Sequence, residues 1–252
     1  MGLRDHVLRQ ARERPDGDMA GVFMAEGDLV VERALKAGHR LESILIDARR
    51  QHDLPEIVGD VPVYAASEGV LQRITGYHMH RGAIACFRRP TPTDPTRLLS
   101  TALRLVVMEN VNNPTNLGLV IRSAVGLGMD GLLLDPTSSD PFYRRASRVA
   151  MGEVFALPFA RLDHFPGGLD PLIEAGFRVL ALTPDESATP LSDLEIGPDE
   201  PVALLLGAEG PGLTAGSLAA AHECVTIPMH RGVDSLNLGT AAAVACYAIC
   251  QG

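Results

Sequence analysis

The sequence contains no tryptophan, and aromatic residues make up only 4% of its 252 positions. An aromatic cage or a platform for stacked bases needs several rings, so both are disfavoured. No run of about eighteen apolar residues is present, and the first ten residues, MGLRDHVLRQ, lack the pattern of a signal peptide. We therefore expect no membrane association and a cytoplasmic location.

Metal-binding patterns are also scarce. The cysteines show no CxxC spacing and lie at Cys86, Cys224, Cys246 and Cys250. Free thiols in a reducing compartment are the simplest interpretation. The sequence HMH at 78–80 has no further ligands at a suitable spacing, so we expect no metal site.

The charge balance is acidic, with 22 basic and 31 acidic residues and a net charge of −9. Such a balance argues against a general nucleic-acid binder, although an acidic protein can still hold an arginine patch for phosphates. Residues 1–100 carry fourteen basic and fourteen acidic side chains, whereas residues 101–252 carry eight and seventeen. The excess of acid therefore lies in the second part of the chain.

Prolines mark a division of the chain. RRPTPTDPTRL has prolines at 90, 92 and 95, a density that continues neither a helix nor a central strand. We expect an arm or helix over 1–20, a small α/β domain over 21–88, a linker over 89–99 and a larger domain over 100–252. In the small domain the patterns predict helices over 27–38 and 68–74 and strands over 41–47, 61–67 and 82–87.

The larger domain alternates apolar runs with helical segments. Strands are predicted over 103–109, 131–135, 178–183, 202–207 and 224–229. Continuous apolar strands separated by helices are typical of a parallel sheet that is covered on both faces. Hydrophobic residues make up 46% of the chain, which is ample for packed cores. The predicted class is therefore α/β.

Ligands of parallel α/β sheets bind beyond the carboxyl ends of the strands, so the strand-to-helix turns are the candidates for a site. Three turns are unusual, namely ENVNNPTNLGLVIRSA, LLLGAEGPGL and IPMHRGVDSLNLGTAAA. Each also has a simple structural interpretation. Asn116 is a possible cap of the helix that follows, Ser235 or Asn237 a possible cap of the last helix, and GAEGPG a possible ordinary tight turn. GAEGPG lacks the GxGxxG spacing of a dinucleotide site, and GxxxxGK[ST] is absent.

Taken together and in this order, the three turns resemble the motifs of the SpoU/TrmH family of RNA ribose 2′-O-methyltransferases, which belong to the SPOUT superfamily. The resemblance covers about residues 104–250. The first turn matches at Asn116, Gly118 and Arg122, the second at Gly207, Glu209, Gly210 and Gly212, and the third at Ile227, Pro228, Met229, Ser235, Leu236 and Asn237. EGDLVVERALKAG and HRGAIA resemble the ribosomal-protein-like substrate-binding domain that precedes many members. The chain departs from the family at Arg81, where glutamine is frequent, and at Ala150, where serine is common.

This resemblance implies a parallel-sheet SPOUT domain with a deep trefoil knot, one of the few exceptions to unknotted connections. It implies S-adenosylmethionine as cofactor, bound by Thr183, Gly207, Ala208, Glu209, Gly212, Ile227, Met229, Ser235, Leu236 and Asn237. The implied activity is methylation of a ribose 2′-hydroxyl in structured RNA by a homodimer, with rRNA favoured over tRNA. A non-catalytic RNA-binding protein that uses the fold as a scaffold is the alternative, which the intact motif residues disfavour.

The implied catalytic residues are Arg122, Asn116, Glu209, Ser235 and Asn237. The family proposal makes the equivalent of Arg122 a general base, but deprotonating an arginine near pH 7 costs roughly 7–8 kcal/mol. Stabilisation of the developing alkoxide by Arg122 is the interpretation we favour. Glu209 is expected to orient Arg122 or a nearby amide, and Ser235 either binds the methionine end of the cofactor or caps a helix. Expected RNA contacts are Arg81, Arg144, Arg145 and Arg148, for which a solvated helix face is the alternative.

Overall fold

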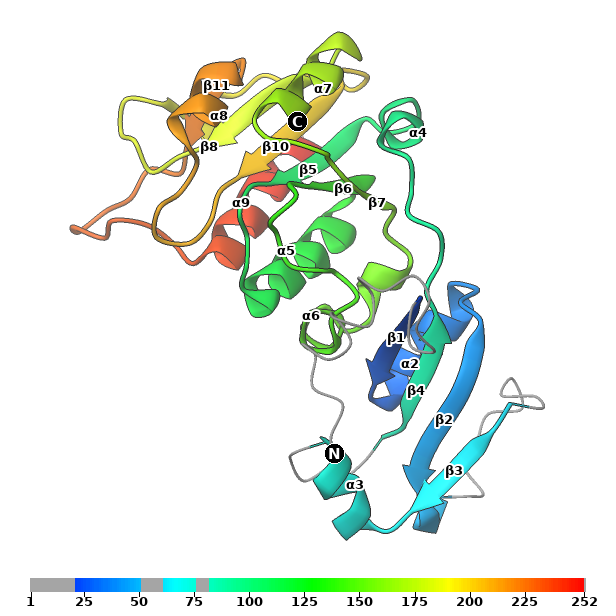
Figure 1. The fold of residues 1–252 in the computed structure, drawn as a ribbon. Coiled ribbons are helices and arrows are strands. Elements are labelled where there is room, and N and C mark those ends of the chain that lie inside the picture. Colours follow the sequence, from blue (N-terminus) through cyan, green and yellow to red (C-terminus); the bar gives the residue numbers. More distant parts are fainter. Residues whose placement is uncertain (1–20, 51–60, 76–81, 252) are drawn as a thin grey trace. The chain divides into compact units, whose positions relative to one another are not determined.

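The computed structural model describes residues 21–50, 61–75 and 82–251, which form two compact units (Figure 1). The first unit holds the described residues up to Thr91 together with Phe142–Ala156, and the second unit holds Pro92–Pro141 and the described residues from Leu157 onward. The chain first passes from one unit to the other between Thr91 and Pro92, inside the expected linker at 89–99. The inclusion of Phe142–Ala156 in the first unit differs from the expected continuous domain over 100–252.

The first unit is built on a four-stranded sheet with the order β1-β4-β2-β3. The strands are β1 Val22–Glu26, β2 Leu41–Asp47, β3 Val63–Ala66 and β4 Ile84–Arg88, and the helices are α2 Asp28–Lys36 and α3 Glu68–Thr75, with a short 3-10 turn at Ala48–Arg50. Strand β4 pairs antiparallel with β1 and β2, whereas β2 and β3 are parallel. The pattern predictions located three of these strands and both helices, but missed β1.

Aromatic side chains explain why Phe142–Ala156 belongs to the first unit. The Phe23 ring of β1 lies 4.6 Å from the Phe142 ring and 5.1 Å from the Phe155 ring, measured between centroids. His39 packs edge-on against the same three rings, and burial lowers the pKa of its imidazole. Between the two phenylalanines lies α6, Arg144–Val149, and a 3-10 turn covers Glu153–Phe155. Four of the eleven Phe and Tyr residues of the chain, Phe23, Phe87, Phe142 and Phe155, therefore share one small core.

The second unit contains a seven-stranded sheet with the order β7-β6-β5-β10-β8-β11-β9. The strands are β5 Arg104–Met108, β6 Gly131–Leu134, β7 Phe159–Arg161, β8 Arg178–Leu182, β9 Thr189–Pro190, β10 Val202–Leu206 and β11 Glu223–Thr226. Each neighbouring pair is parallel. Every residue of β5, β6 and β10 is buried, as expected for strands covered on both faces. The predicted parallel α/β sheet is confirmed.

The helices of the second unit are α4 Pro95–Leu99, α5 Pro114–Leu127, α7 Asp170–Glu174, α8 Ala215–Ala220 and α9 Leu238–Gln251, with 3-10 turns at Gly167–Leu169 and Leu191–Asp193. Helix α4 lies inside the expected linker at 89–99. Pro95 occupies the first turn of α4, where a proline needs no N–H, and Asp94 caps it by accepting from the Thr96 amide at 3.0 Å.

Helices α5 and α9 pack side by side, far apart in sequence but adjacent in space (Figure 1). Their close approach depends on Gly239, because a Cβ atom at this position would lie 2.5 Å from Cβ of Leu119. Helix α5 begins at Asn113, which accepts from the Thr115 amide, and ends at Gly128, whose φ is 94°. This packing places the first turns of both helices at the same edge of the sheet, beyond the carboxyl ends of β5 and β10.

Candidate functional site

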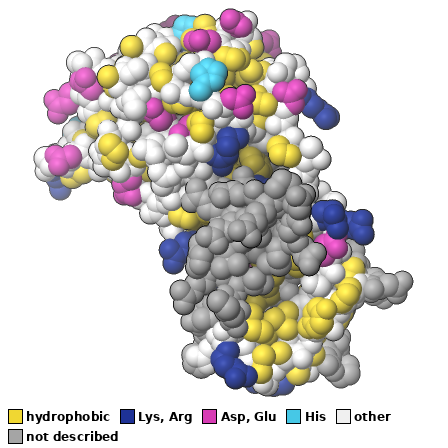
Figure 2. All heavy atoms as spheres, in the orientation of Figure 1, with side chains coloured by type: hydrophobic (Ala, Val, Ile, Leu, Met, Phe, Trp, Pro, Cys, Tyr) yellow, Lys and Arg dark blue, Asp and Glu magenta, His cyan; other side chains and the backbone are white. Residues whose placement is uncertain are grey.

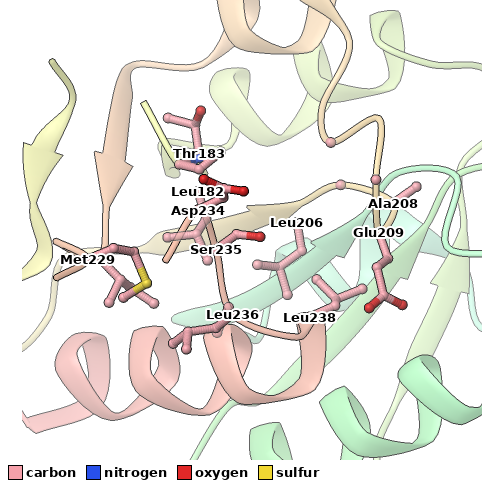
Figure 3. Close-up of a pocket in the computed structure, with 16 residues that line it drawn as sticks. Leu182, Thr183, Leu206, Ala208, Glu209, Met229, Asp234, Ser235, Leu236 and Leu238 are labelled. Carbon is pink, nitrogen blue, oxygen red and sulfur yellow. The ribbon is translucent and has the colours of Figure 1, made fainter. Parts of the chain in front are cut away.

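A pocket lies at the carboxyl edge of β8, β10 and β11, three neighbouring strands of the second sheet. Its walls come from the segments that follow these strands and from the start of α9 (Figure 3). In this view Leu206 and Leu236 lie between Met229 on one side and Glu209 on the other. Glu209 and Asp234 are carboxylates, and no lysine or arginine lines the pocket among the described residues. The site is therefore apolar with negative charge at two points.

Nine of the ten residues expected to bind cofactor line this pocket. They are Thr183, Gly207, Ala208, Glu209, Gly212, Ile227, Met229, Ser235 and Leu236; the tenth, Asn237, does not line it. Seven further lining residues were missed, namely Leu182, Pro184, Leu206, Gly210, Asp234, Leu238 and Ala241. Most of them directly precede or follow an expected residue in the sequence. Their position next to the motifs was therefore the only feature of the sequence that could have indicated them. Leu182 and Leu206 are the last residues of β8 and β10, and Ala241 lies one turn into α9.

The loop after β10 is folded tightly on itself. Gly212 donates its amide to the Ala208 carbonyl at 3.0 Å, and Gly210 and Gly212 have φ of 94° and 70°. At Gly207 a Cβ atom would lie 2.3 Å from the carbonyl carbon of Gly212, which no side chain movement relieves. The glycines thus serve both conformation and close backbone approach. A tight turn was expected here, and the turn that the structure contains also lines the pocket.

A hydrogen-bonded group of three polar side chains adjoins the pocket at Glu209. The Asn116 amide donates to Glu209 at 2.6 Å, and the Asn237 amide donates both to Glu209 and to the Asn116 oxygen at 3.3 Å. Asn116 is buried on α5, whereas Glu209 belongs to the loop after β10. Residues from three separate motifs are therefore joined. The sequence left open whether Glu209 pairs with Arg122 or with a nearby amide, and in the structure it accepts from two amides.

The structure shows which of the motif residues Asn116, Ser235 and Asn237 cap a helix. Asn116 is not the cap of α5, because Asn113 occupies that position. Asn237 does have a structural role at α9, since its side-chain oxygen accepts from the Gly239 amide at 3.0 Å. Ser235 forms no hydrogen bond with any residue that the structure describes, so its side chain does not cap a helix. It is exposed and lines the pocket. Of these three residues, only Asn237 both caps a helix and belongs to the hydrogen-bonded group at Glu209.

Arg122 lies away from the pocket of its own chain. It is exposed on α5, does not line the pocket, and forms no hydrogen bond or ion pair with the residues that the structure describes. Glu209 has the two amides as partners and not Arg122. The guanidinium is thus available to a molecule outside this chain.

The expected RNA-contacting arginines differ in their surroundings. Arg148 donates to the buried Glu26 of β1 at 2.9 Å, and Arg144 lies 3.3 Å from the same carboxylate. Arg145, between them in sequence, is exposed. Arg81 lies outside the described residues. Two of the four arginines therefore hold α6 against β1, and Arg145 points to solvent.

The described residues form neither a metal site nor a membrane-spanning helix. No three His, Cys, Asp or Glu side chains there are grouped so that they could hold a metal ion, and residues 78–80 fall outside those ranges. The helices described at 21–50, 61–75 and 82–251 include none with the length and apolar character needed to cross a bilayer.

Comparisons with known proteins agree with this architecture. Residues 104–247 match the model of the SpoU rRNA methylase family, and residues 6–85 match that of the MRM3-like substrate-binding domain. An uncharacterised tRNA/rRNA methyltransferase of Mycobacterium bovis is 40% identical over 244 residues, covering 95% of this chain and 85% of the relative. The 23S rRNA (guanosine(2553)-2′-O)-methyltransferase RlmP of Bacillus subtilis is 30% identical over 227 residues, covering 89% and 87% of the two chains.

Solved structures give the same result. The AdoMet-bound rRNA methyltransferase of Sinorhizobium meliloti superposes with a TM-score of 0.78 at 25% identity, covering 99% of this chain and 95% of that one. The SpoU methyltransferase AviRb of Streptomyces viridochromogenes superposes with a TM-score of 0.80 at 22% identity, covering 100% and 98%. These matches define the class, an RNA methyltransferase preceded by a substrate-binding domain. The chain belongs to the SpoU rRNA methylase family. The predicted family and fold class are confirmed, and the trefoil knot stays a prediction.

Proposed function

We propose that this protein methylates a ribose 2′-hydroxyl in structured RNA, with S-adenosylmethionine as donor and rRNA rather than tRNA as substrate. The observation that carries the proposal is the pocket at the carboxyl edge of the sheet, with the linked side chains of Asn116, Glu209 and Asn237 beside it. The likeness to RlmP, a 23S rRNA 2′-O-methyltransferase, supports the choice of rRNA. We also propose that the protein acts in the cytoplasm.

The pocket suits this cofactor chemically. When bound, S-adenosylmethionine supplies a methyl group activated by a sulfonium, and it also carries an ammonium group. Apolar walls accommodate an adenine, and the carboxylates of Glu209 and Asp234 favour a cationic ligand. Backbone groups around Thr183, Gly207, Ile227 and Leu236 hold the adenine, ribose and methionine parts in this proposal. Apolar side chains do not hinder such backbone contacts, which is why a cofactor site can read as core in the sequence.

The side chains beside the pocket position and stabilise the reacting hydroxyl. With the cofactor held in the pocket, the ribose oxygen would lie in line behind the methyl carbon. The new C–O bond would form as the bond between the methyl carbon and sulfur breaks, and the hydroxyl proton would pass to solvent water. Asn116 and Asn237 orient the substrate and the cofactor, and Glu209 fixes both amides. Because arginine keeps its proton, Arg122 stabilises the developing alkoxide and binds an adjacent phosphate rather than acting as the base.

The active form in this proposal is a homodimer in which Arg122 acts in the site of the partner subunit. Arg122 is exposed on α5 and does not line the pocket of its own chain. On the neighbouring helix α9, Val244 and Tyr247 are 41% and 59% exposed. Exposed apolar side chains three residues apart form one helix face, which suits contact with a second copy.

Mixing two inactive variants tests this arrangement. Arg122→Ala and Asn237→Ala subunits, each inactive alone, form a mixed dimer with one complete site if Arg122 acts in the partner. Random exchange then restores about a quarter of the wild-type sites. Methyl transfer after co-refolding at equal concentrations is the measurement, and Arg122→Ala mixed with itself is the control. An inactive mixture that still contains mixed dimers would contradict the arrangement.

Arg145 is proposed as a direct RNA contact. Acidic side chains are scattered over the visible face of the unit with the seven-stranded sheet (Figure 2), so phosphate binding depends on a few arginines. Arg145→Ala should weaken RNA binding a few-fold and reduce the slope of log affinity against log salt by about one. Salt-dependent binding to rRNA fragments measures both. Arg97→Ala, at an exposed arginine of α4, is the control and should leave the slope unchanged.

Transfer of a labelled methyl group tests the activity itself. RNA from cells that lack the protein is incubated with the enzyme and S-adenosylmethionine, and labelled RNA is separated by size and digested to nucleosides. Label confined to a 2′-O-methylated nucleoside in rRNA is expected. Label only in tRNA would overturn the choice of substrate, and absence of both cofactor binding and label would overturn the proposed activity.

A further inference from the structure

Glu109, at the end of β5, binds both ends of the pocket loop. Its backbone amide donates to the Leu206 carbonyl at 2.8 Å, directly before the loop. Its carboxylate accepts from the Thr214 amide at 3.0 Å and from the Thr214 hydroxyl at 2.8 Å, directly after the loop. The residue that directly follows β5 therefore fixes the chain on either side of Gly207–Leu213.

The contact is buried, and the carboxylate accepts from three donors. Glu109 is 5% exposed, and a third donor, the hydroxyl of the fully buried Ser217, lies 2.9 Å from the same carboxylate. The Thr214 hydroxyl also caps α8 by accepting from the Ser217 amide. An ionised carboxylate has two oxygens that only accept hydrogen bonds, so it can accept from all three donors at once. Glu109 thus joins the loop, the start of α8 and β5.

We propose that Glu109 is a positioning residue that keeps the Gly207–Leu213 loop in its cofactor-binding conformation; this inference rests on the proposed function. Glu109 does not line the pocket, so it acts through the loop, which carries Glu209. If the loop opens, Glu209 leaves the amides of Asn116 and Asn237, and the backbone that lines the pocket moves with it. Cofactor binding must then first close the loop, and the apparent affinity falls by the closed fraction.

Glu109→Gln changes this contact with almost no change in volume. The glutamine NH₂ group faces at least one of the three donors, so a buried donor loses its acceptor. Without any cofactor, the Gly212 amide, bonded to the Ala208 carbonyl, should exchange its hydrogen at least about tenfold faster. Hydrogen exchange of peptides that cover residues 206–214 measures this loosening directly.

The same variant should separate binding from chemistry. The Kd for S-adenosylmethionine, measured by calorimetry, and its KM should rise at least about tenfold. The kcat at saturating cofactor should stay within about threefold of wild type, because bound cofactor closes the loop again. A general loss of folded protein lowers the active fraction but does not give this separation of KM from kcat.

Two controls separate loop positioning from stability. Thr214→Ser keeps the hydroxyl that Glu109 binds and should behave as wild type, whereas Thr214→Val removes it and should resemble Glu109→Gln. Asp135→Asn changes another buried carboxylate, which accepts from Thr137 and Ser138 and does not contact this loop. This variant should lose stability without a change in cofactor Kd.

Each outcome supports or overturns the inference. Faster exchange at residues 206–214 together with the raised Kd supports it. A wild-type Kd and wild-type exchange in folded Glu109→Gln would overturn it. If the wild-type enzyme binds no S-adenosylmethionine while exchange still accelerates in Glu109→Gln, the proposed function fails and the role of Glu109 in holding the loop stands.

Discussion

Replacement of Arg122 by alanine should reduce methyl transfer by about a hundredfold to a thousandfold, the usual effect of removing one group that stabilises developing charge. Binding of S-adenosylmethionine should be unchanged, because Arg122 does not line the pocket. The fold should also tolerate the change, since Arg122 is exposed and forms no hydrogen bond or ion pair within the described residues. Single-turnover methylation at saturating RNA and cofactor, together with the cofactor Kd, measures both effects.

Arg122→Lys distinguishes the possible roles of this residue. Lysine keeps the positive charge and loses the planar fork that binds a phosphate with two donors. If charge stabilises the alkoxide, lysine restores part of the rate that alanine loses. Activity no higher than that of Arg122→Ala, with RNA binding intact, would contradict simple charge stabilisation.

Replacement of Gly207 by alanine should weaken binding of S-adenosylmethionine by about a hundredfold or more, equivalent to roughly 3 kcal/mol. The added Cβ atom would lie 2.3 Å from the carbonyl carbon of Gly212 and 2.5 Å from the Leu213 amide nitrogen. Both are backbone atoms, so the loop itself must shift, and the cofactor depends on that backbone. Calorimetric titration of the folded variant gives the Kd.

Gly210→Ala is the matched control for this prediction. Gly210 lies in the same loop with φ of 94°, but a Cβ atom there meets nothing within 4 Å. Alanine at this position suffers only the backbone strain of a positive φ, about 1–3 kcal/mol. We expect a clearly smaller loss of affinity than in Gly207→Ala. An equal loss in both variants would show that strain, and not close backbone approach, limits the loop.

Local sequence patterns predicted the parallel sheet and singled out the three turns, and the resemblance to the SpoU/TrmH family supplied the residues expected to bind cofactor, most of which line the pocket. Buried strands such as β5 and β10 are continuous apolar runs, and residues at strand ends meet at one edge of a parallel sheet, whichever helices intervene. This geometry made the three separated turns predictable as one site. Strand β1 was missed because VFMAE is short and not strictly alternating, and α4 because its prolines mark a helix start as readily as a linker.

Long-range contacts were beyond the reach of local patterns. Nothing in the spacing of Phe142 and Phe155 indicates that they pack on Phe23, yet this packing brings α6 into the first unit. The pairing of Arg144 and Arg148 with Glu26 depends on that packing, so an expected phosphate patch contains two arginines already engaged by a carboxylate. The link between Asn116 and Glu209 likewise follows from two strands becoming neighbours.

The position of Arg122 was partly accessible from helix geometry. Six residues of an α-helix separate Asn116 from Arg122, a rotation of about 240°. The two side chains therefore leave α5 in different directions, and a buried Asn116 predicts an Arg122 that faces elsewhere. The motif alone gave the two residues without this distinction. The placement of Arg122 in the site of a second subunit comes from the resemblance to the family, and the exposure of Arg122 on α5 agrees with it.

Mapping of ribose methylation in the cell tests whether this protein methylates rRNA. The 2′-O-methyl groups of all rRNA and tRNA are mapped in a strain without this protein, and in strains that carry the wild type or Arg122→Ala. We expect the loss of 2′-O-methylation at a defined rRNA position, restored by the wild type and not by Arg122→Ala. An unchanged set of 2′-O-methylated riboses in rRNA and tRNA in the deletion strain would contradict it.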